Sequence, residues 1–202
     1  MFNDENALRE LMKLLRSIRP KFNLPMRLEP FLKQHMDEYR PKDHEKLVVQ
    51  GQIPLFAYFI ISGYLYVTYK NKDGKLRVKY FYPENNIVAF VCFLDGLPSK
   101  YTLHAGHNTK LAMISRDNMD KLFEEMAGMR DFAATVIMED DARREEAMEG
   151  LMELGHKLRI AEFYARYPML LPAALLRLDR LIAKFLKLKP RTLRKHRNEL
   201  GL

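Results

Sequence analysis

The repeated short β-type runs in the middle of the chain constrain its fold more than any other feature. Between residues 46 and 115, about seven runs rich in Val, Ile, Phe and Tyr recur at roughly ten-residue spacing. Breaks rich in Gly, Asn and Asp separate them, and Asn71–Gly74 has the composition of a hairpin turn. This pattern predicts an antiparallel sandwich or small barrel, with strands at 46–49, 58–62, 64–69, 76–82, 87–93, 101–105 and 111–115.

The segments on either side of this β region have helical periodicity. Residues 1–40 place apolar side chains at three- and four-residue steps, so covering helices are expected there. Apolar residues recur at the same spacing from Ser115 to Met126 and from Met129 to about Leu154. We therefore predict an α+β protein with a β domain and N-terminal helices over 1–117, a helical connector over 118–155 and a helical domain over 156–202.

The segment from Met129 to Leu154 predicts one helix of about seven turns, which needs a packing partner because propensity alone does not stabilise it. Two interpretations of its apolar stripe remain open. The stripe packs on the chain's own domain, or it forms a two-fold seam with a second copy, which we favour. Asp140 and Arg143 would lie near that seam, where cross-chain ion pairs could satisfy them. The stripe consists of Phe132, Ala133, Val136, Ile137, Ala147, Met148, Leu151 and Leu154.

Charge is distributed unevenly along the chain. Residues 156–202 carry twelve Lys or Arg and three Asp or Glu, whereas the other 155 residues carry 22 basic and 23 acidic side chains. A near-neutral body joined to a basic segment indicates a polyanionic partner, either nucleic acid or a membrane surface. The basic segment has too little apolar face for an interfacial helix, and no apolar run approaches the ~20 residues of a membrane span. We expect double-stranded DNA as the partner and no membrane.

The stretch from Leu181 to Asn198 contains the most informative motif. Its apolar residues are spaced so that two short helices share a small core, which comprises Ile182, Ala183, Leu186, Leu188 and Leu193. A row of polar and basic side chains projects from one side of the second helix. Duplex DNA requires such a row, because cations neutralise phosphates and Arg bonds guanine bidentately. The sequence thus predicts a helix-turn-helix with the candidate DNA-binding residues Lys189, Arg191, Thr192, Arg194, Lys195 and Asn198.

The order of these parts resembles the Crp/Fnr (catabolite-activator and fumarate–nitrate regulator) superfamily of bacterial transcription regulators. The resemblance spans nearly the whole chain and is most specific in the helix-turn-helix. There the family pattern I-A-x-x-L-x-[ILV]-x-x-x-T-[LV]-S-R-x-R is matched at Ile182, Ala183, Leu186, Leu188, Thr192, Leu193 and Arg197. The resemblance implies a cyclic-nucleotide-binding-like jelly roll, a long helix that forms a homodimer and a C-terminal DNA-binding domain. It also implies base-reading positions at Arg191, Arg194 and Lys195, and a phosphate contact at Thr192.

The C-terminal domain departs from the family pattern in ways that change the expectation. Family members usually carry Gly in the turn between the two helices, where this chain has Lys187. A left-handed backbone there costs a non-Gly residue about 1–2 kcal/mol. The family's Ser-Arg is Arg194-Lys195 here, which makes the face more cationic. Since the sequence stops at Leu202, wing strands are expected only before Leu175, and residues 169–176 indicate helix or turn instead.

The β domain departs further from the family. Its cyclic-nucleotide-binding members use a Gly-Glu pair for the ribose and an Arg-Ser/Thr-Ala triplet for the cyclic phosphate, a bidentate contact. Aligned on residues 102–105, both essential groups are missing in this chain. We therefore predict a regulator that does not depend on a cyclic nucleotide. The candidate pocket for an unidentified small effector consists of Val88, Ala89, Ser99, Lys100 and Tyr101.

Other classes of site are not indicated. Cys92 is the single cysteine, which excludes an internal disulfide, and the six histidines lack metal-ligand spacing. No glycine-rich phosphate loop or nucleophile motif is present, so we expect no enzyme, cofactor or metal site. No secretory signal is visible, and we expect a cytoplasmic protein that contacts RNA polymerase if it activates transcription. The alternative is a small-ligand-binding protein whose basic segment binds acidic partners or nucleic acid nonspecifically.

Overall fold

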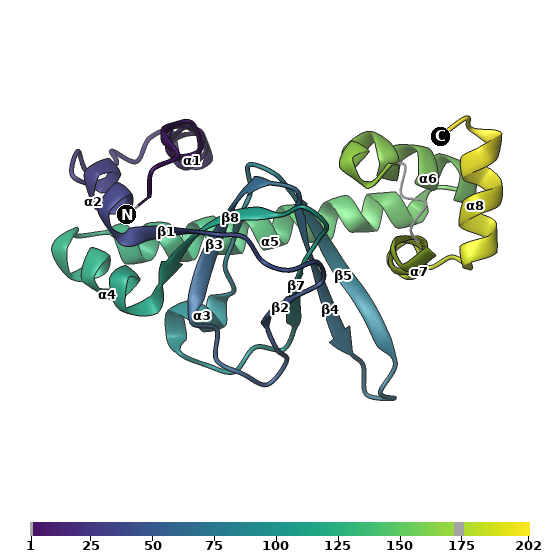
Figure 1. Cartoon of the computed structure of the whole chain (residues 1–202), viewed down its shortest axis with the longest axis horizontal. Coiled ribbons are helices and arrows are strands. Elements are labelled where there is room, and N and C mark those ends of the chain that lie inside the picture. The colour runs from purple at the N-terminus through teal and green to yellow at the C-terminus, as the bar shows by residue number, and fades with distance from the viewer. Residues whose placement is uncertain (1, 172–175) are drawn as a thin grey trace.

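Two four-stranded antiparallel sheets form the middle of the molecule, and helices lie at both ends (Figure 1). The computed structural model describes residues 2–171 and 176–202. Side chains from both sheets form a buried cluster between them. The predicted α+β class with antiparallel sheets is therefore confirmed. The strands are β1 (Met36–Tyr39), β2 (Lys46–Val48), β3 (Phe56–Ser62), β4 (Tyr64–Lys70), β5 (Leu76–Pro83), β6 (Ile87–Val88), β7 (Thr102–Ala105) and β8 (Lys110–Ser115).

The strand order is β1-β8-β3-β6 in one sheet and β2-β7-β4-β5 in the other. Strands β4 and β5 form the hairpin predicted at Asn71–Gly74, with Lys70 opposite Leu76. The turn between β3 and β4 requires Gly63, whose φ is 82°. A Cβ at this position would lie 2.8 Å from the Thr109 Cα, so the chain passes too closely for any other residue.

Two segments differ from the predicted elements. Residues 36–39, expected as helix, form β1 because they pair with β8 along their whole length. Residues 91–93, expected as the end of a strand, begin the short helix α3 (Val91–Asp95), which is followed by Gly96 with a φ of 68°. Its Phe93 and Leu94 are buried. In both segments a tertiary contact decides the structure, and local periodicity does not contain that information.

The remaining helices cover the sandwich and connect it to the C-terminal end. Helix α5 has 25 residues and runs past both sheets toward the C-terminal helices (Figure 1). None of the helices in the described ranges has the length and apolar character of a membrane span. The helices are α1 (Glu5–Ile18), α2 (Leu28–His35), α3 (Val91–Asp95), α4 (Arg116–Glu125), α5 (Met129–Glu153), α6 (His156–Arg166), the 3-10 helix η1 (Pro168–Leu170), α7 (Leu176–Phe185) and α8 (Pro190–Glu199).

Half of the apolar stripe of α5 is buried within the chain itself, and its other four residues are half-buried. Its first half, including Phe132 and Val136, packs in a cluster with α1, α2, α4 and the β3 and β8 side chains. Its second half packs with the C-terminal helices through Leu151. The stripe that we expected to form a two-fold seam therefore follows the alternative interpretation of packing on its own domain. A different face of α5 is open to solvent and includes Met138, which is 63% exposed.

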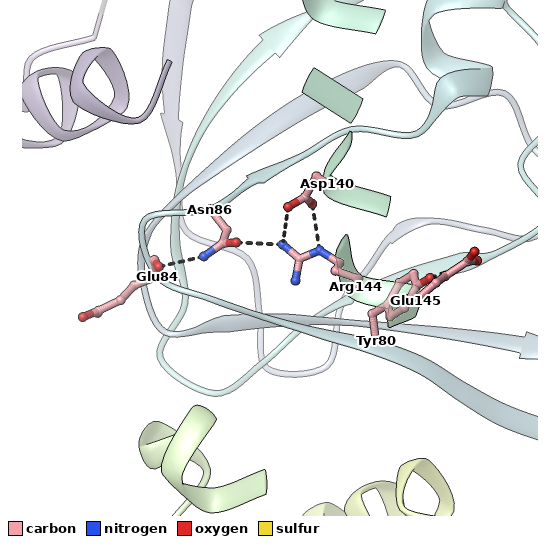
Figure 2. A network of polar contacts seen from close by, with 6 residues as sticks. All are labelled: Tyr80, Glu84, Asn86, Asp140, Arg144 and Glu145. Atoms are coloured by element: carbon pink, nitrogen blue, oxygen red, sulfur yellow. Dashed lines mark hydrogen bonds and ion pairs between the residues drawn. The ribbon is translucent and has the colours of Figure 1, made fainter. Parts of the chain in front are cut away.

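Part of the polar middle of α5 is satisfied within the chain (Figure 2), whereas Arg143 is exposed and has no hydrogen-bond or ion-pair partner among the described residues. The Arg144 Nε donates to Asp140 at 2.7 Å, and its Nη2 donates to the Asn86 side-chain oxygen at 2.7 Å. The guanidinium carbon lies 4.0 Å from the centre of the Tyr82 ring. Asp140, for which we expected a cross-chain partner, is thus paired by its own helix. The same contacts tie α5 to the loop between β5 and β6.

Candidate nucleic-acid interface

A tight connection joins α7 to α8. Lys187, at the position where the family usually has glycine, has a left-handed φ of 56°. The Leu188 N–H donates to the Ala183 carbonyl at 2.8 Å, and the Lys187 N–H donates to the Lys184 carbonyl at 3.4 Å. These two bonds form a Schellman motif, which satisfies carbonyls at the end of α7. Pro190 then begins α8, where its missing N–H leaves no hydrogen bond unmade.

The helix pair rests on a closed apolar core. Ile182, Leu186 and Leu193 have no exposed surface, and Ala183 is 1% exposed. Leu188 is half-buried against the same cluster, which also includes aromatic side chains of α6. All five residues expected to form the core therefore lie in it. Such a core fixes which side of α8 faces outward.

A buried ion pair holds α8 against α6 and α7. The Arg197 Nη1 donates to the Asp179 carboxylate at 2.7 Å and to the Tyr164 hydroxyl at 3.2 Å. The Asp179 side chain is 6% exposed and that of Arg197 is 15% exposed. Burial opposes the charged form, but the bonds to Asp179 and Tyr164 raise the pKa of Arg197 above its ordinary value. Arg197 therefore stabilises the C-terminal unit, which consists of α6, α7 and α8, from within.

A second inward arginine joins α5 to this unit. The Arg159 Nη2 donates to the Met152 and Leu154 carbonyls at 2.7 and 2.8 Å, and its Nη1 donates to the Leu186 carbonyl at 3.0 Å. These carbonyls lie at the C-terminal ends of α5 and α7, where helix carbonyls lack intrahelical partners. The charges of Arg159 and Arg197 are thus engaged inside the chain and do not contribute to the exposed basic face.

Helix α8 lies at the outer end of the molecule (Figure 1), and its other Arg and Lys side chains are exposed. Arg191 has no hydrogen-bond or ion-pair partner within residues 2–171 and 176–202. Lys195 is 70% exposed and makes a 3.8 Å contact with Glu199. No side chain caps the N-terminus of α8, so its free N–H groups are open to an anion. The exposed candidates are Lys189, Arg191, Arg194, Lys195 and Asn198, whereas Thr192 is half-buried.

The connection between α6 and α7 is the place where we expected any wing strands. Its first part, η1, is a 3-10 helix with Leu170 buried in the core of the C-terminal unit. Residues 172–175 lie outside the described residues. The described part of this connection contains no strand, in agreement with the expected helix or turn.

The five candidate effector residues do not form one pocket. Val88 packs between the sheets, whereas Ala89 lines an apolar cavity of about 100 Å³ next to α5. Ser99 is buried, and its hydroxyl accepts from the Tyr101 N–H and donates to the Tyr101 carbonyl. Lys100 is exposed. The five positions are thus divided among separate environments.

A lysine that the sequence analysis did not single out lies beside Tyr101. The Lys79 Nζ donates to the Tyr101 hydroxyl at 3.0 Å, and it lies 4.7 and 4.6 Å from the ring centres of Tyr80 and Tyr101. Glu145 of α5 pairs with it at 3.4 Å. Burial opposes the charged form, but the Tyr101 hydrogen bond raises the pKa of Lys79. Burial raises the pKa of Tyr80 to about 12. The signal in the sequence was a lysine within an aromatic strand.

Comparison with known proteins adds structural relatives. No family model and no curated protein matches the sequence. A cyclic nucleotide-binding domain from Methylobacillus flagellatus KT is 17% identical with a TM-score of 0.63, over 77% of this chain and 89% of that one. FixK2 from Bradyrhizobium japonicum is 16% identical with a TM-score of 0.64, over 82% and 83%. The catabolite activator protein of Thermus thermophilus is 15% identical with a TM-score of 0.53, over 90% and 85%. The chain shares its fold with these three proteins.

Three residues that hold the C-terminal helices in place were missing from the sequence prediction. They are Asp179, Tyr164 and Arg159. Asp179 carried a detectable signal, because it is a lone acid on a helix that is otherwise apolar and basic. Arg159 carried none, since its partners are backbone carbonyls, which every residue has.

Proposed function

We propose that this protein is a DNA-binding transcription regulator of the Crp/Fnr type that acts as a homodimer and needs no cyclic nucleotide. The observation that carries the proposal is the exposed face of α8. There Arg191, Arg194 and Lys195 face solvent, while Leu193 and Arg197 hold the helix from behind. In this proposal α7 and α8 are a helix-turn-helix, and α8 is the recognition helix.

The exposed face has the chemistry that duplex DNA requires. Arg191 and Arg194 are three residues apart, so their side chains are neighbours on α8 and can reach adjacent base pairs. Their planar guanidinium groups suit bidentate contacts, whereas Lys195 supplies a point charge to a phosphate. The uncapped N-terminus of α8 and Lys189 just before it add phosphate contacts, which set the register on the duplex.

A symmetric dimer would present α8 twice, with half-sites about 34–36 Å apart. We place the two-fold seam on the solvent face of α5, which carries Thr135, Met138 and Ala142 at three- and four-residue steps. Met138→Glu puts a charge into this seam and is expected to halve the mass measured by light scattering. An unchanged dimer mass, or a wild-type chain that is monomeric at micromolar concentration, would reject the seam.

Independence from cyclic nucleotides is supported by the groups that occupy the corresponding region. Ser99 stands where the family's phosphate-binding arginine is expected, and its hydroxyl bonds the chain's own backbone. Lys79 is already held by Tyr101 and Glu145. Calorimetry with cyclic AMP is expected to show no saturable heat, and DNA binding is expected without it. Saturable binding that strengthens the DNA complex would contradict this part of the proposal.

The experiment that tests DNA recognition first selects the preferred site from random duplexes and then compares variants on that site. Each bidentate arginine contact discriminates by about 1–3 kcal/mol. The double variant Arg191→Ala/Arg194→Ala is therefore expected to weaken binding to the preferred site at least about 30-fold, since 1.4 kcal/mol is tenfold. Arg130→Ala, an exposed arginine on α5, is the matched control and should bind as the wild type does.

The outcome also separates the proposal from a nonspecific basic segment. Recognition by α8 predicts that the double variant loses its preference for the selected site while it keeps part of its salt-dependent binding. A segment that binds nonspecifically predicts equal affinity for all duplexes, before and after the substitutions. Failure of the selection to enrich any sequence would overturn the proposed function.

A further inference from the structure

A cavity of about 370 Å³ lies where the β sandwich, α5 and the C-terminal helices meet. Tyr80 and Asn86 line it from the β domain, and Arg166, Tyr167 and Phe185 line it from the C-terminal unit. Helix α5 forms a further wall. The volume of the cavity falls within the range of about 300–1,000 Å³ that small-molecule sites occupy, and such sites are frequent between domains.

One arginine of this cavity is held in a fixed orientation (Figure 2). Asp140 and Asn86 accept hydrogen bonds from the Nε and Nη2 of Arg144, and the Tyr82 ring covers one face of its guanidinium. The Arg144 side chain is 12% exposed. Its Nη1 has no hydrogen-bond partner among the described residues. The chain therefore orients this donor without using it.

Two further arginines give the cavity an excess of positive charge. Arg143 is exposed and has no hydrogen-bond or ion-pair partner in the described part of the chain. Arg166 is exposed and makes a 3.5 Å pair with Glu162, one turn earlier on α6. Asp140 is the only carboxylate among the described lining residues, and Arg144 neutralises it. The two remaining arginines would balance a dianion.

The other lining residues are apolar or aromatic. Ala147, Met148 and Leu151 line the α5 wall, and Tyr167 and Phe185 line the C-terminal wall. A bare anion would leave these surfaces in contact with water, whereas an organic group attached to the anion would cover them. The ligand chemistry that fits both walls is a compact organic body that carries a dianionic head.

We propose that this cavity binds a small organic phosphate monoester. Such an ester carries a charge of about −1.5 to −2 at pH 7, which matches the excess of two arginines over carboxylates among the described lining residues. Arg143, Arg144 and Arg166 bind its phosphate, and the organic body lies against Met148 and Leu151. The proposal concerns a site outside α8 and does not require that the protein bind DNA.

Calorimetry on the full chain without DNA tests this site with four probes. Adenosine 5′-monophosphate and phenyl phosphate are the monoesters, inorganic phosphate is the anion without a body, and adenosine is the body without an anion. At least one monoester is expected to bind saturably at one site per chain, and at least tenfold more tightly than inorganic phosphate. Adenosine is expected to give no saturable heat.

Variants show whether the binding occurs in this cavity. Arg143→Ala and Arg166→Ala are each expected to weaken the monoester at least tenfold, and Arg143→Lys is expected to restore part of the loss. Arg130→Ala, on the same helix but outside the cavity, should bind as the wild type does. Because Arg143 has no hydrogen-bond or ion-pair partner among residues 2–171 and 176–202, its variants should unfold at the wild-type temperature. Wild-type affinity in Arg143→Ala, or no saturable heat with either monoester, would overturn the proposal.

Discussion

Helix α8 and the β sandwich use basic side chains in opposite ways. On α8, Arg191 has no partner in the described part of the chain and Lys195 is 70% exposed, so both charges remain available to another molecule. In the sandwich, Lys79 lies against two tyrosine rings and pairs with Glu145, so the fold itself uses its charge. The comparison shows that partners and exposure, rather than the number of charges, separate a binding surface from a stabilising contact.

The largest effect is expected at the ion pair behind α8. Asp179→Ala leaves the Arg197 charge without its partner in a nearly buried position. Breaking such a pair costs about 3–5 kcal/mol, which chemical denaturation would measure as a lower free energy of unfolding. Glu162→Ala is the control, because its pair with Arg166 is half-exposed and worth at most about 1 kcal/mol. A loss no larger than that of the control would show that the Asp179 pair does not hold α8.

The β sandwich is expected to respond to acid through His104. Burial lowers the pKa of His104 to about 4, and the charges of Lys46 and Arg177 act in the same direction. Its ring stacks on Tyr66 at 4.6 Å, and its Nε2 lies 2.8 Å from the Thr68 hydroxyl. As the pH falls below about 6.5, the unfolded chain gains a proton that the folded chain resists. The contribution of His104 to stability is therefore full above pH 6.5 and is lost as the pH falls to 4.

This acid response is measured as the free energy of unfolding between pH 7 and pH 4. In His104→Gln the decline should be shallower, because the replaced group does not titrate. Some decline should remain, because burial and the charge of Arg177 also lower the pKa of His44. His156→Gln, at an exposed position, serves as the control and should keep the wild-type slope. An unchanged slope in His104→Gln would contradict the assignment.

A moderate effect is expected from Lys79, the half-buried lysine of β5. Lys79→Met keeps most of the side-chain volume but removes the charge between the Tyr80 and Tyr101 rings and the partner of Glu145. Since a cation–π contact contributes about 0.5–2 kcal/mol, thermal and chemical unfolding should report a loss in that range. Lys75→Met, in the exposed part of the same hairpin, should change stability by less than about 0.5 kcal/mol. Equal losses of stability in Lys79→Met and Lys75→Met would show that the contacts of Lys79 stabilise the fold no more than an exposed lysine does.

Much of the fold could be predicted because it depends on local periodicity. The alternating strands and the apolar spacing of α7 and α8 are properties of neighbouring residues. The stripe of α5 shows the limit of this reasoning. Phe132 and Val136 have the spacing that a subunit seam needs, yet an intrachain cluster needs the same spacing. Sequence periodicity reports that a face is buried and does not report which molecule buries it.

The candidate nucleic-acid interface also has a part that the sequence predicts and a part that it does not. The outward direction of Arg191 and Arg194 was predictable, because the helical period turns both away from the buried side of Leu193. The inward pairing of Arg197 was not, because Asp179 lies 18 residues away on another helix. The grouping of arginines around the cavity between the β sandwich, α5 and the C-terminal helices was not predicted, for the same reason. Arg143 and Arg166 come together only after α5 and α6 have packed.

The smallest effect is expected where the turn before α8 departs from the Crp/Fnr pattern that the sequence resembles. Lys187 has a φ of 56°, a conformation that disfavours any residue with a Cβ by about 1–2 kcal/mol. Glycine adopts this conformation freely but loses more chain entropy on folding, so Lys187→Gly should raise the free energy of unfolding by about 1 kcal/mol. Lys187→Ala removes the same charge but keeps the Cβ, so it should not give this gain. If alanine stabilises as much as glycine, the removed charge rather than the backbone is responsible. In that case the left-handed backbone of Lys187 would not make this helix pair less stable than one with glycine in the turn.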